Sequence, residues 1–169
     1  MVLALLSITA QPLNIANLVQ AVSEEQARQA RDAGTANAGG IASFLGMVRS
    51  PNQGRRVLHL EYEAYEPLAV RVFERIRDEM VAEWPGTVLA LHHRIGRLEP
   101  GEVSVAIVVA SWHRAAAFAG CRYAIERVKQ IAPIWKREAF EGGDIWIEGA
   151  VATPDDEGAR REALKLACV

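Results

Sequence analysis

The segment from Val103 to Ser111 places the strongest constraint on the fold, because it is almost continuously apolar. A segment of this length suits one β-strand, and apolar residues at both alternating positions are typical of a strand that is covered on both faces. It is far shorter than the roughly 20 residues that a membrane-spanning helix needs. We therefore expect this segment to form the centre of a sheet in a water-soluble domain.

Hydrophobic periodicity predicts the other elements. Turn residues from Ser50 to Gly54 indicate that the strands on either side form a hairpin. Strands and helices mix without a regular βαβ order, which favours an α+β fold with a mostly antiparallel sheet. Strands are predicted at 2–10, 41–48, 57–65, 87–95, 103–111, 134–140 and 144–148, and helices at 13–26, 67–83 and 115–131.

The composition suits one domain, since 50% of the 169 residues are hydrophobic and 24% are charged. We assign residues 1–150 to this domain. We expect residues 151–169 to be a flexible C-terminal tail, because the chain from Thr153 onward is small, charged and weakly periodic. Residues 159–166 could form one or two helical turns in it. The stretch 27–40 is rich in Ala and Gly and is expected to be a fraying helix end followed by a loop.

Charge and cysteine usage narrow the classes of partner. A formal net charge of −2 gives no overall attraction to nucleic acid or to an anionic membrane, so any anion site must be local. Cys121 and Cys168 are far apart and have no CxxC partner, which indicates neither a disulfide framework nor a zinc cluster. No basic segment precedes the first apolar run, as one would in a secretory signal. We expect a cytoplasmic protein.

Lysine is rare in this chain, and two of its three lysines stand close together. Lys129 and Lys136 lie on either side of Pro133, which tends to end or kink a helix, so the two amines flank one bend. A lysine in an apolar pocket or near other cations has a lowered pKa and can act as acid, base or nucleophile. Trp135 offers part of such a pocket. Two solvated lysines are the alternative interpretation.

A second cationic segment joins the apolar strand to an Ala-rich helix. Free backbone N–H groups and the positive end of the dipole at a helix start attract anions, and His113 and Arg114 would strengthen such a site. An exposed helix start without a ligand is the alternative. Arg49 adds a third cation at the end of another predicted strand.

Other polar residues give weaker signals. His92 and His93 are strand neighbours that face opposite ways, so we expect one packed and one surface histidine, with no shared metal. Glu61, Glu63 and Glu66 are predicted to form a solvated face. The chain has no HExxH, P-loop, GxGxxG or GxSxG motif. The remaining candidate site residues are basic, which suits a phosphorylated or otherwise anionic substrate. They are Arg49, His113, Arg114, Lys129, Lys136 and Arg137.

Six blocks of sequence occur in an order that is typical of one family. They cover roughly residues 38 to 148. The blocks are Phe44–Arg49, Leu60–Tyr65, His92–Gly96, Gly101–Glu102, Ser111–Phe118 and Lys129–Glu138. In this order they resemble the catalytic, or large, subunit family of molybdopterin synthase.

The resemblance implies an α/β-hammerhead fold with an additional α+β subdomain. It implies a homodimer that binds one small subunit at each far end, which gives a heterotetramer. The small subunit is ubiquitin-like, and its C-terminal Gly-Gly carries a thiocarboxylate. That group donates sulfur to cyclic pyranopterin monophosphate (precursor Z), and two transfers form the molybdopterin dithiolene in molybdenum cofactor biosynthesis. The implied activity is a sulfurtransferase that needs no metal or other cofactor, because molybdenum is added later, and that binds neither nucleic acid nor membrane.

The family's functional residues are carried over by motif. Lys129 and Lys136 match the catalytic lysines, which we expect to stabilise oxyanions and to assist proton transfers. Arg49, His113 and Arg114 would hold the phosphate, partly from the other protomer. The implied substrate-binding positions are Met47, Val48, Arg49, His113, Arg114, Lys129, Lys136, Arg137 and Glu138.

The chain departs from the family's pattern at one place. Family members often carry a basic residue just after the Trp-x-Glu that matches Trp146–Glu148, whereas this chain has Gly149 and Ala150. The sulfur is expected to come from the partner rather than from Cys121, which we expect to be a small buried thiol.

Two other functions fit part of the sequence. A non-catalytic module that docks a ubiquitin-like partner would be expected to lose Lys129 or Lys136, yet both are present. An unrelated phosphoester-binding enzyme would account for the cations but not for the ordered blocks.

Overall fold

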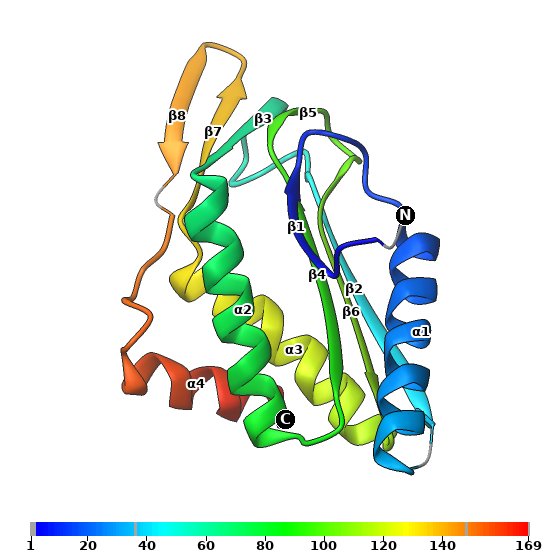
Figure 1. Ribbon diagram of the computed structural model, residues 1–169. Helices are drawn as coiled ribbons and strands as arrows, with labels where there is room; N and C mark the ends of the chain where they lie inside the picture. Colours follow the sequence, from blue (N-terminus) through cyan, green and yellow to red (C-terminus); the bar gives the residue numbers. More distant parts are fainter. Residues whose placement is uncertain (1–2, 36, 148, 169) are drawn as a thin grey trace.

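The computed structural model describes residues 3–35, 37–147 and 149–168, and its strands form two four-stranded sheets (Figure 1). Val2 and Glu148, which the sequence assigned to strands, lie outside the described residues. The elements are β1 (Leu6–Thr9), α1 (Ile15–Ala33), β2 (Gly40–Met47), β3 (Val57–Ala64), α2 (Glu66–Glu83), β4 (Val88–Arg94), β5 (Gly96–Leu98), β6 (Val103–Ser111), α3 (Arg114–Ile131), β7 (Ile134–Phe140), β8 (Gly143–Ile147) and α4 (Glu157–Ala167).

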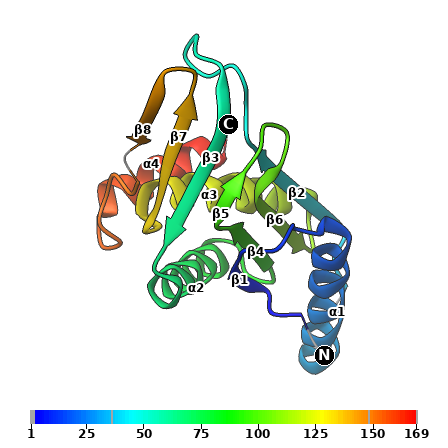
Figure 2. The ribbon, with the colours of Figure 1, turned by 90° about the horizontal axis from the view of Figure 1, so that it is seen from above.

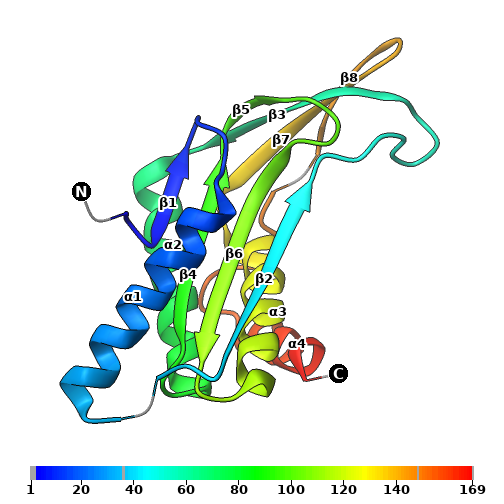
Figure 3. The same ribbon diagram turned by 90° about the vertical axis from the view of Figure 1, so that its right-hand side faces the viewer.

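The first sheet has the strand order β1-β4-β6-β2 and is covered on both faces. Figure 3 shows α1 against one face, with α2 and α3 on the other. Leu18 of α1 packs with Ala106 and Val108, whereas Ile107 packs with Phe73 of α2. The apolar run therefore forms the buried sheet interior that the sequence predicted.

The second sheet has the order β5-β3-β7-β8, and its four strands lie side by side in Figure 2. Among the described strands only β1 and β4 pair in parallel, which confirms the α+β class with mostly antiparallel pairing. None of the described helices is long and apolar enough to cross a membrane.

The predicted hairpin between residues 41–48 and 57–65 is wrong. Strand β2 pairs with β6 from Gly40 to a bulge at Gly46 and Met47, and the chain then leaves the first sheet. Strand β3 pairs instead with β5 and β7. The physical reason is a separate small core, in which Val57 and Leu60 pack with other residues between the sheets.

Helix α1 is longer than the sequence indicated, because it continues to Ala33 rather than ending near residue 26. Its buried stripe continues through Gln26 and Ala30, neither of which carries a large apolar side chain. The helix ends at Gly34, whose φ of 63° is the left-handed conformation that favours glycine at a helix C-terminus.

The C-terminal segment packs against the domain. Backbone N–H groups of Val151 and Ala152 both donate to the Gln130 carbonyl, and helix α4 then lies along α3 with Ala163 fully buried. Helix α4 includes 159–166, where the sequence allowed one or two helical turns, and its packing against α3 was not expected of a tail. Small alanine side chains give a weak hydrophobic period, yet they allow two helices to approach closely.

A buried ion pair joins α2, α3 and the segment before α4. Arg127 is fully buried, and its Nε and Nη2 donate to the two Glu79 carboxylate oxygens at 2.9 Å each. The Tyr123 hydroxyl also donates to Glu79, and Arg127 reaches the Pro154 carbonyl. Burial by itself would raise the Glu79 pKa, but hydrogen bonds from Arg127, Tyr123 and Arg75 outweigh it and hold that pKa below its usual value.

Arg127→Met is expected to lower the free energy of unfolding by about 3–5 kcal/mol, because it leaves a buried carboxylate without its cation. The matched control is Arg56→Met, since Arg56 pairs with Glu141 in solvent with 74% of its side chain exposed. That variant should lose less than about 1 kcal/mol. Urea unfolding at neutral pH measures both, and equal losses would contradict a structural role for the buried pair.

Candidate active site

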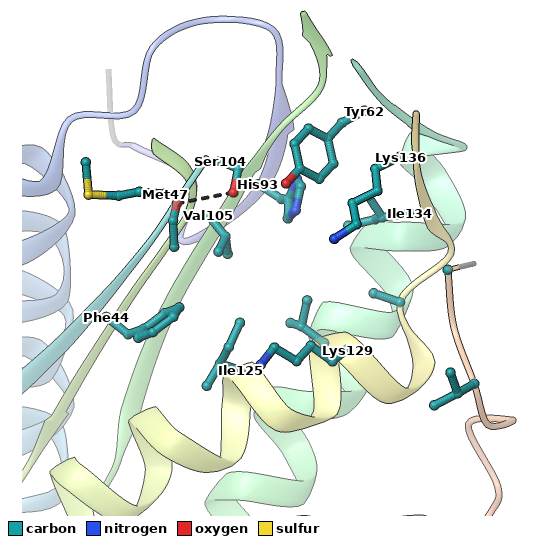
Figure 4. A pocket seen from close by; sticks show the side chains of 15 residues that line it. Phe44, Met47, Tyr62, His93, Ser104, Val105, Ile125, Lys129, Ile134 and Lys136 are labelled. Atoms are coloured by element: carbon teal, nitrogen blue, oxygen red, sulfur yellow. Dashed lines mark hydrogen bonds between the residues drawn. The ribbon is translucent and has the colours of Figure 1, made fainter. Parts of the chain in front are cut away.

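A cavity of about 420 Å³ lies where the two sheets meet (Figure 4). Strands β2, β4 and β6 line it from the first sheet, β3 and β7 from the second, and α3 closes another side. Its apolar lining includes Phe44, Val105 and Ile125. A cavity of this size suits a small organic ligand rather than a single ion.

Lys129 and Lys136 converge on this cavity. Helix α3 ends at Ile131, and Pro133 separates it from β7, so the chain turns and carries Lys136 back across from Lys129. Figure 4 shows both amines pointing into the cavity. The bend predicted around Pro133 therefore brings the two lysines into one site.

The environment of Lys136 lowers its pKa. Burial of the amine is the main cause, and the positive charges of Arg49 and Lys129 act in the same direction, while Glu138 opposes them. Such an amine gives up its proton more readily near neutral pH than an ordinary lysine does. Lys136 is therefore suited to proton transfer as well as to charge stabilisation.

Glu138 and Arg137 lie on opposite faces of β7, as strand alternation requires. Glu138 is buried and accepts a hydrogen bond of 2.9 Å from the Asn52 side-chain amide. It does not line the cavity, but its negative charge acts on Lys136, which lies on the same face of β7. Arg137 forms an ion pair with Glu61 and lies 5.8 Å from the Trp146 ring centroid. Arg137 does not line the cavity.

Met47, Val48 and Arg49, the site residues predicted at the end of β2, differ in their relation to the cavity. Met47 lines the cavity and is half exposed. Val48 is buried in the small core between the sheets. Arg49 lies near enough for its charge to lower the Lys136 pKa. Of the three residues, Met47 alone lines the cavity, while Arg49 acts on it through its charge and Val48 packs in the core beside it.

His113 and Arg114 lie far from the lysines within one chain. They begin α3, whereas Lys129 is in its last turn, so roughly 22 Å of helix separates Arg114 from Lys129. Gly40, at the start of β2, packs directly against Arg114, because a Cβ there would lie 3.3 Å from the Arg114 Cα. One chain alone does not bring the two cationic groups together.

The interpretation of the histidine pair is wrong in one respect, because both rings are buried. His92 and His93 are 8% and 6% exposed, since β4 is an inner strand covered on both faces. The His92 ring is hydrogen-bonded to the Ala4 carbonyl, whereas His93 lines the cavity together with Tyr62 and Ser104. Sequence reasoning missed these three cavity residues, although two of them lie in the blocks that the family shares.

Three other observations bear on the chemistry. Cys121 is buried as expected, and burial raises its thiol pKa to about 11, which makes it a poor nucleophile. Gly149 lines the cavity where the family often has a basic residue nearby, and a Cβ there would lie 2.8 Å from the Ile134 carbonyl oxygen. Among the residues that the structure describes, no group of His, Cys, Asp or Glu side chains could hold a metal ion.

The fold and the site define a class: an α+β enzyme subunit with a partly apolar cavity that two lysine side chains line. Comparison with known families makes this specific. A family model described as "MoaE protein" matches residues 8–131, and the chain belongs to this family. The resemblance that the six sequence blocks indicated is therefore confirmed.

Relatives and solved structures agree with this assignment. The molybdopterin synthase catalytic subunit of Bacillus subtilis is 43% identical over 146 residues, which is 86% of each chain. That of Pyrococcus abyssi is 44% identical over 68% of this chain and 78% of its own. The structure of molybdopterin synthase from Staphylococcus aureus matches with a TM-score of 0.77 and 35% identity, over 86% of this chain and 98% of that one. A complex of subunits 1 and 2 of molybdopterin-converting factor from Helicobacter pylori matches with a TM-score of 0.67 and 27% identity, over 86% and 91%.

Proposed function

We propose that the chain is the catalytic subunit of a cytoplasmic molybdopterin synthase. It transfers sulfur from the C-terminal thiocarboxylate of a ubiquitin-like small subunit to cyclic pyranopterin monophosphate. The observation that carries the proposal is the convergence of the Lys129 and Lys136 amines on one partly apolar cavity. The names of the Bacillus subtilis and Pyrococcus abyssi relatives support it.

The lysines suit the charges that sulfur transfer creates. The thiocarboxylate sulfur displaces an oxygen substituent at a pterin side-chain carbon, so that a C–S bond forms as a C–O bond breaks and the oxygen leaves with a proton. Water then attacks the acyl carbon and the acyl C–S bond breaks, so that the small subunit leaves as a carboxylate and the sulfur stays on the pterin as a thiolate. An oxyanion forms at the acyl carbon in the second step, and an ammonium group in an apolar cavity stabilises it strongly. We assign proton transfer to Lys136, because its pKa is lowered, and charge stabilisation to Lys129. Arg49 and Glu138 set the charge around them.

The small subunit is the proposed sulfur donor. The Helicobacter pylori structure is a complex of subunits 1 and 2 of the converting factor, which supports an equivalent complex here. A narrow, flexible Gly-Gly end is able to enter the cavity and bring its anionic terminus to the lysines, and opposite charges favour that contact.

The proposed second copy supplies His113 and Arg114. Strand β2 is the edge of the first sheet, and its exposed apolar side chains include Ile41 and Leu45. If two copies pair antiparallel along β2, the Gly40 end of one strand lies beside the Met47 end of the other. Eight residues of strand span roughly 26 Å, close to the separation along α3, so this pairing brings His113 and Arg114 of the partner subunit toward Met47 and the cavity. Two copies with two small subunits then form a heterotetramer.

The direct test mixes the purified chain with a thiocarboxylated small subunit and cyclic pyranopterin monophosphate. We expect molybdopterin to form and the small subunit to end as a carboxylate, which mass spectrometry detects. A stable complex without product would favour a binding-only module. The absence of both the complex and the product would contradict the proposed function.

A further inference from the structure

One side of the cavity is polar but carries no charge. Tyr62 from β3, His93 from β4 and Ser104 from β6 form this side, which we call the neutral wall, and Figure 4 shows it across the cavity from Lys129. His93 and Ser104 are 6% and 5% exposed, so they lie deep in the site. The charged side chains of the cavity lie elsewhere, on α3 and β7.

His93 is held as one neutral tautomer. Its Nδ1 lies 2.8 Å from the Arg94 carbonyl oxygen, and a carbonyl only accepts, so Nδ1 carries the proton. Burial lowers the His93 pKa to about 4, with a smaller contribution from the Lys136 charge. The Tyr62 ring fixes the imidazole plane through an edge contact, with the centroids 5.1 Å apart. Nε2 therefore keeps a free lone pair, and no hydrogen bond to it occurs from the part of the chain that the structure describes.

Ser104 and Tyr62, the other two members of the neutral wall, also carry no charge. The Ser104 hydroxyl donates to the Gly46 carbonyl at 3.2 Å, so its lone pairs remain available as acceptors. A Cβ at Gly46 would lie 2.6 Å from the Val105 side chain, which shows how closely β2 approaches β6 at this point. Burial raises the Tyr62 pKa although an interaction with Ser104 opposes it, so the phenol stays protonated.

We propose that the neutral wall binds the hydrogen-bonding edge of a flat, nitrogen-rich heterocycle, with His93 Nε2 accepting a hydrogen bond from a substrate N–H. This inference rests on the proposed function, in which that heterocycle is the pterin. An acceptor that faces the cavity without a protein partner selects a ligand that offers a donor, because a ligand without one displaces water and leaves the acceptor unpaired. The cavity volume of about 420 Å³ suits a fused ring system, and Val105 and Ile125 offer apolar contact to its faces.

The two ends of the substrate are thereby assigned to different parts of the cavity. Anionic groups require the cations, so the phosphate and the incoming thiocarboxylate belong with Lys129, Lys136 and Arg49. The neutral ring edge belongs with the wall. The acyl end of the small subunit carries a negative charge, which a lone-pair acceptor would repel, so we assign the wall to the heterocycle rather than to the partner's C-terminus.

The test compares the variants His93→Phe and His93→Gln with the wild type, each in complex with the small subunit. Phenylalanine preserves ring shape and removes both nitrogens, so the KM for cyclic pyranopterin monophosphate should rise about 10- to 100-fold, with a smaller change in kcat. Glutamine places an amide oxygen near the position of Nε2 and should recover most of the loss. Tyr62→Phe removes only a hydroxyl and should raise the same KM severalfold. The affinity for the small subunit should not change in any of the three.

His92→Phe is the matched control, because this neighbouring buried histidine bonds Ala4 and does not line the cavity. Its KM should equal that of the wild type. If His93→Phe does not fold, the KM of Tyr62→Phe decides the question. Normal product from the wild type with an unchanged KM in His93→Phe and Tyr62→Phe would overturn the heterocycle assignment alone. If the same variants bind the small subunit more weakly while their KM for cyclic pyranopterin monophosphate is unchanged, the wall contacts the partner instead. That result would also overturn the heterocycle assignment. A wild type that makes no product would instead overturn the proposed function.

Discussion

Replacing Lys129 or Lys136 with alanine is expected to reduce molybdopterin formation at least about 100-fold while the protein stays folded. Each variant removes a cation from a partly apolar cavity in which developing negative charge has no substitute donor of equal strength. Lys129 is exposed and Lys136 is half buried, so neither contributes much to stability. The measurement is single-turnover product formation, with circular dichroism to follow folding and calorimetry to follow binding of the small subunit.

The chain offers its own control for these variants. Lys165 is its third lysine, lies in α4 with 76% of its side chain exposed, and is distant from the cavity lining. Lys165→Ala should keep full activity. Unfolding of the Lys129 variant, or loss of its complex with the small subunit, would contradict a catalytic role.

Arginine at position 136 separates charge from proton transfer. Lys136→Arg keeps a positive charge but cannot release a proton near neutral pH. If Lys136 transfers a proton, this variant should be nearly as inactive as Lys136→Ala. Recovery of most of the activity by arginine would show that Lys136 acts only through its charge.

The sequence predicted those elements whose hydrophobic period is strong. Strand β6 and helices α2 and α3 have the expected positions, because their buried residues are mostly large or regularly spaced. The end of α1 was missed because Gln26 and Ala30 continue its buried stripe without large apolar side chains. Strand β5, of only three residues, gives too short a pattern to detect. The false hairpin shows that turn residues predict a change of direction but not the partner strand.

The site was predictable to the extent that its residues carry charge. The lysines drew attention through their rarity and through the bend at Pro133. The other cations stood out by their places at predicted strand and helix ends, and the family resemblance then indicated the same residues. Strand alternation could have separated Arg137 from Lys136, because neighbouring strand residues face opposite ways. Tyr62 and Ser104 gave no signal of their own, since such residues in strands usually pack in a core or face solvent. Only the tertiary structure shows that they share a cavity with His93.

In one chain, His113 and Arg114 lie far from Lys129 and Lys136. This separation allows a direct test of whether the partner subunit completes each site in the dimer. A Lys129→Ala protomer lacks its own lysine, and a protomer with both His113→Ala and Arg114→Ala lacks the cations at the start of α3. Each homodimer should be nearly inactive. In a mixed dimer one site carries both defects, whereas the other combines intact lysines from one subunit with intact His113 and Arg114 of the partner subunit. Random pairing makes half of the dimers mixed, so an equal mixture should recover about a quarter of wild-type activity.

The matched control mixes Lys129→Ala with Lys136→Ala protomers. These lysines line one cavity of the same chain, so every site in the mixed dimer keeps a defect and activity should not recover. Differently tagged protomers, combined by refolding and purified through both tags, show that mixed dimers have formed. If purified mixed dimers of the first pair were inactive, His113 and Arg114 would serve no site across the interface. Recovery in the first mixture and none in the second would mean that each cavity is completed by the other copy, and that the roughly 22 Å between Arg114 and Lys129 in one chain is bridged only by dimerisation.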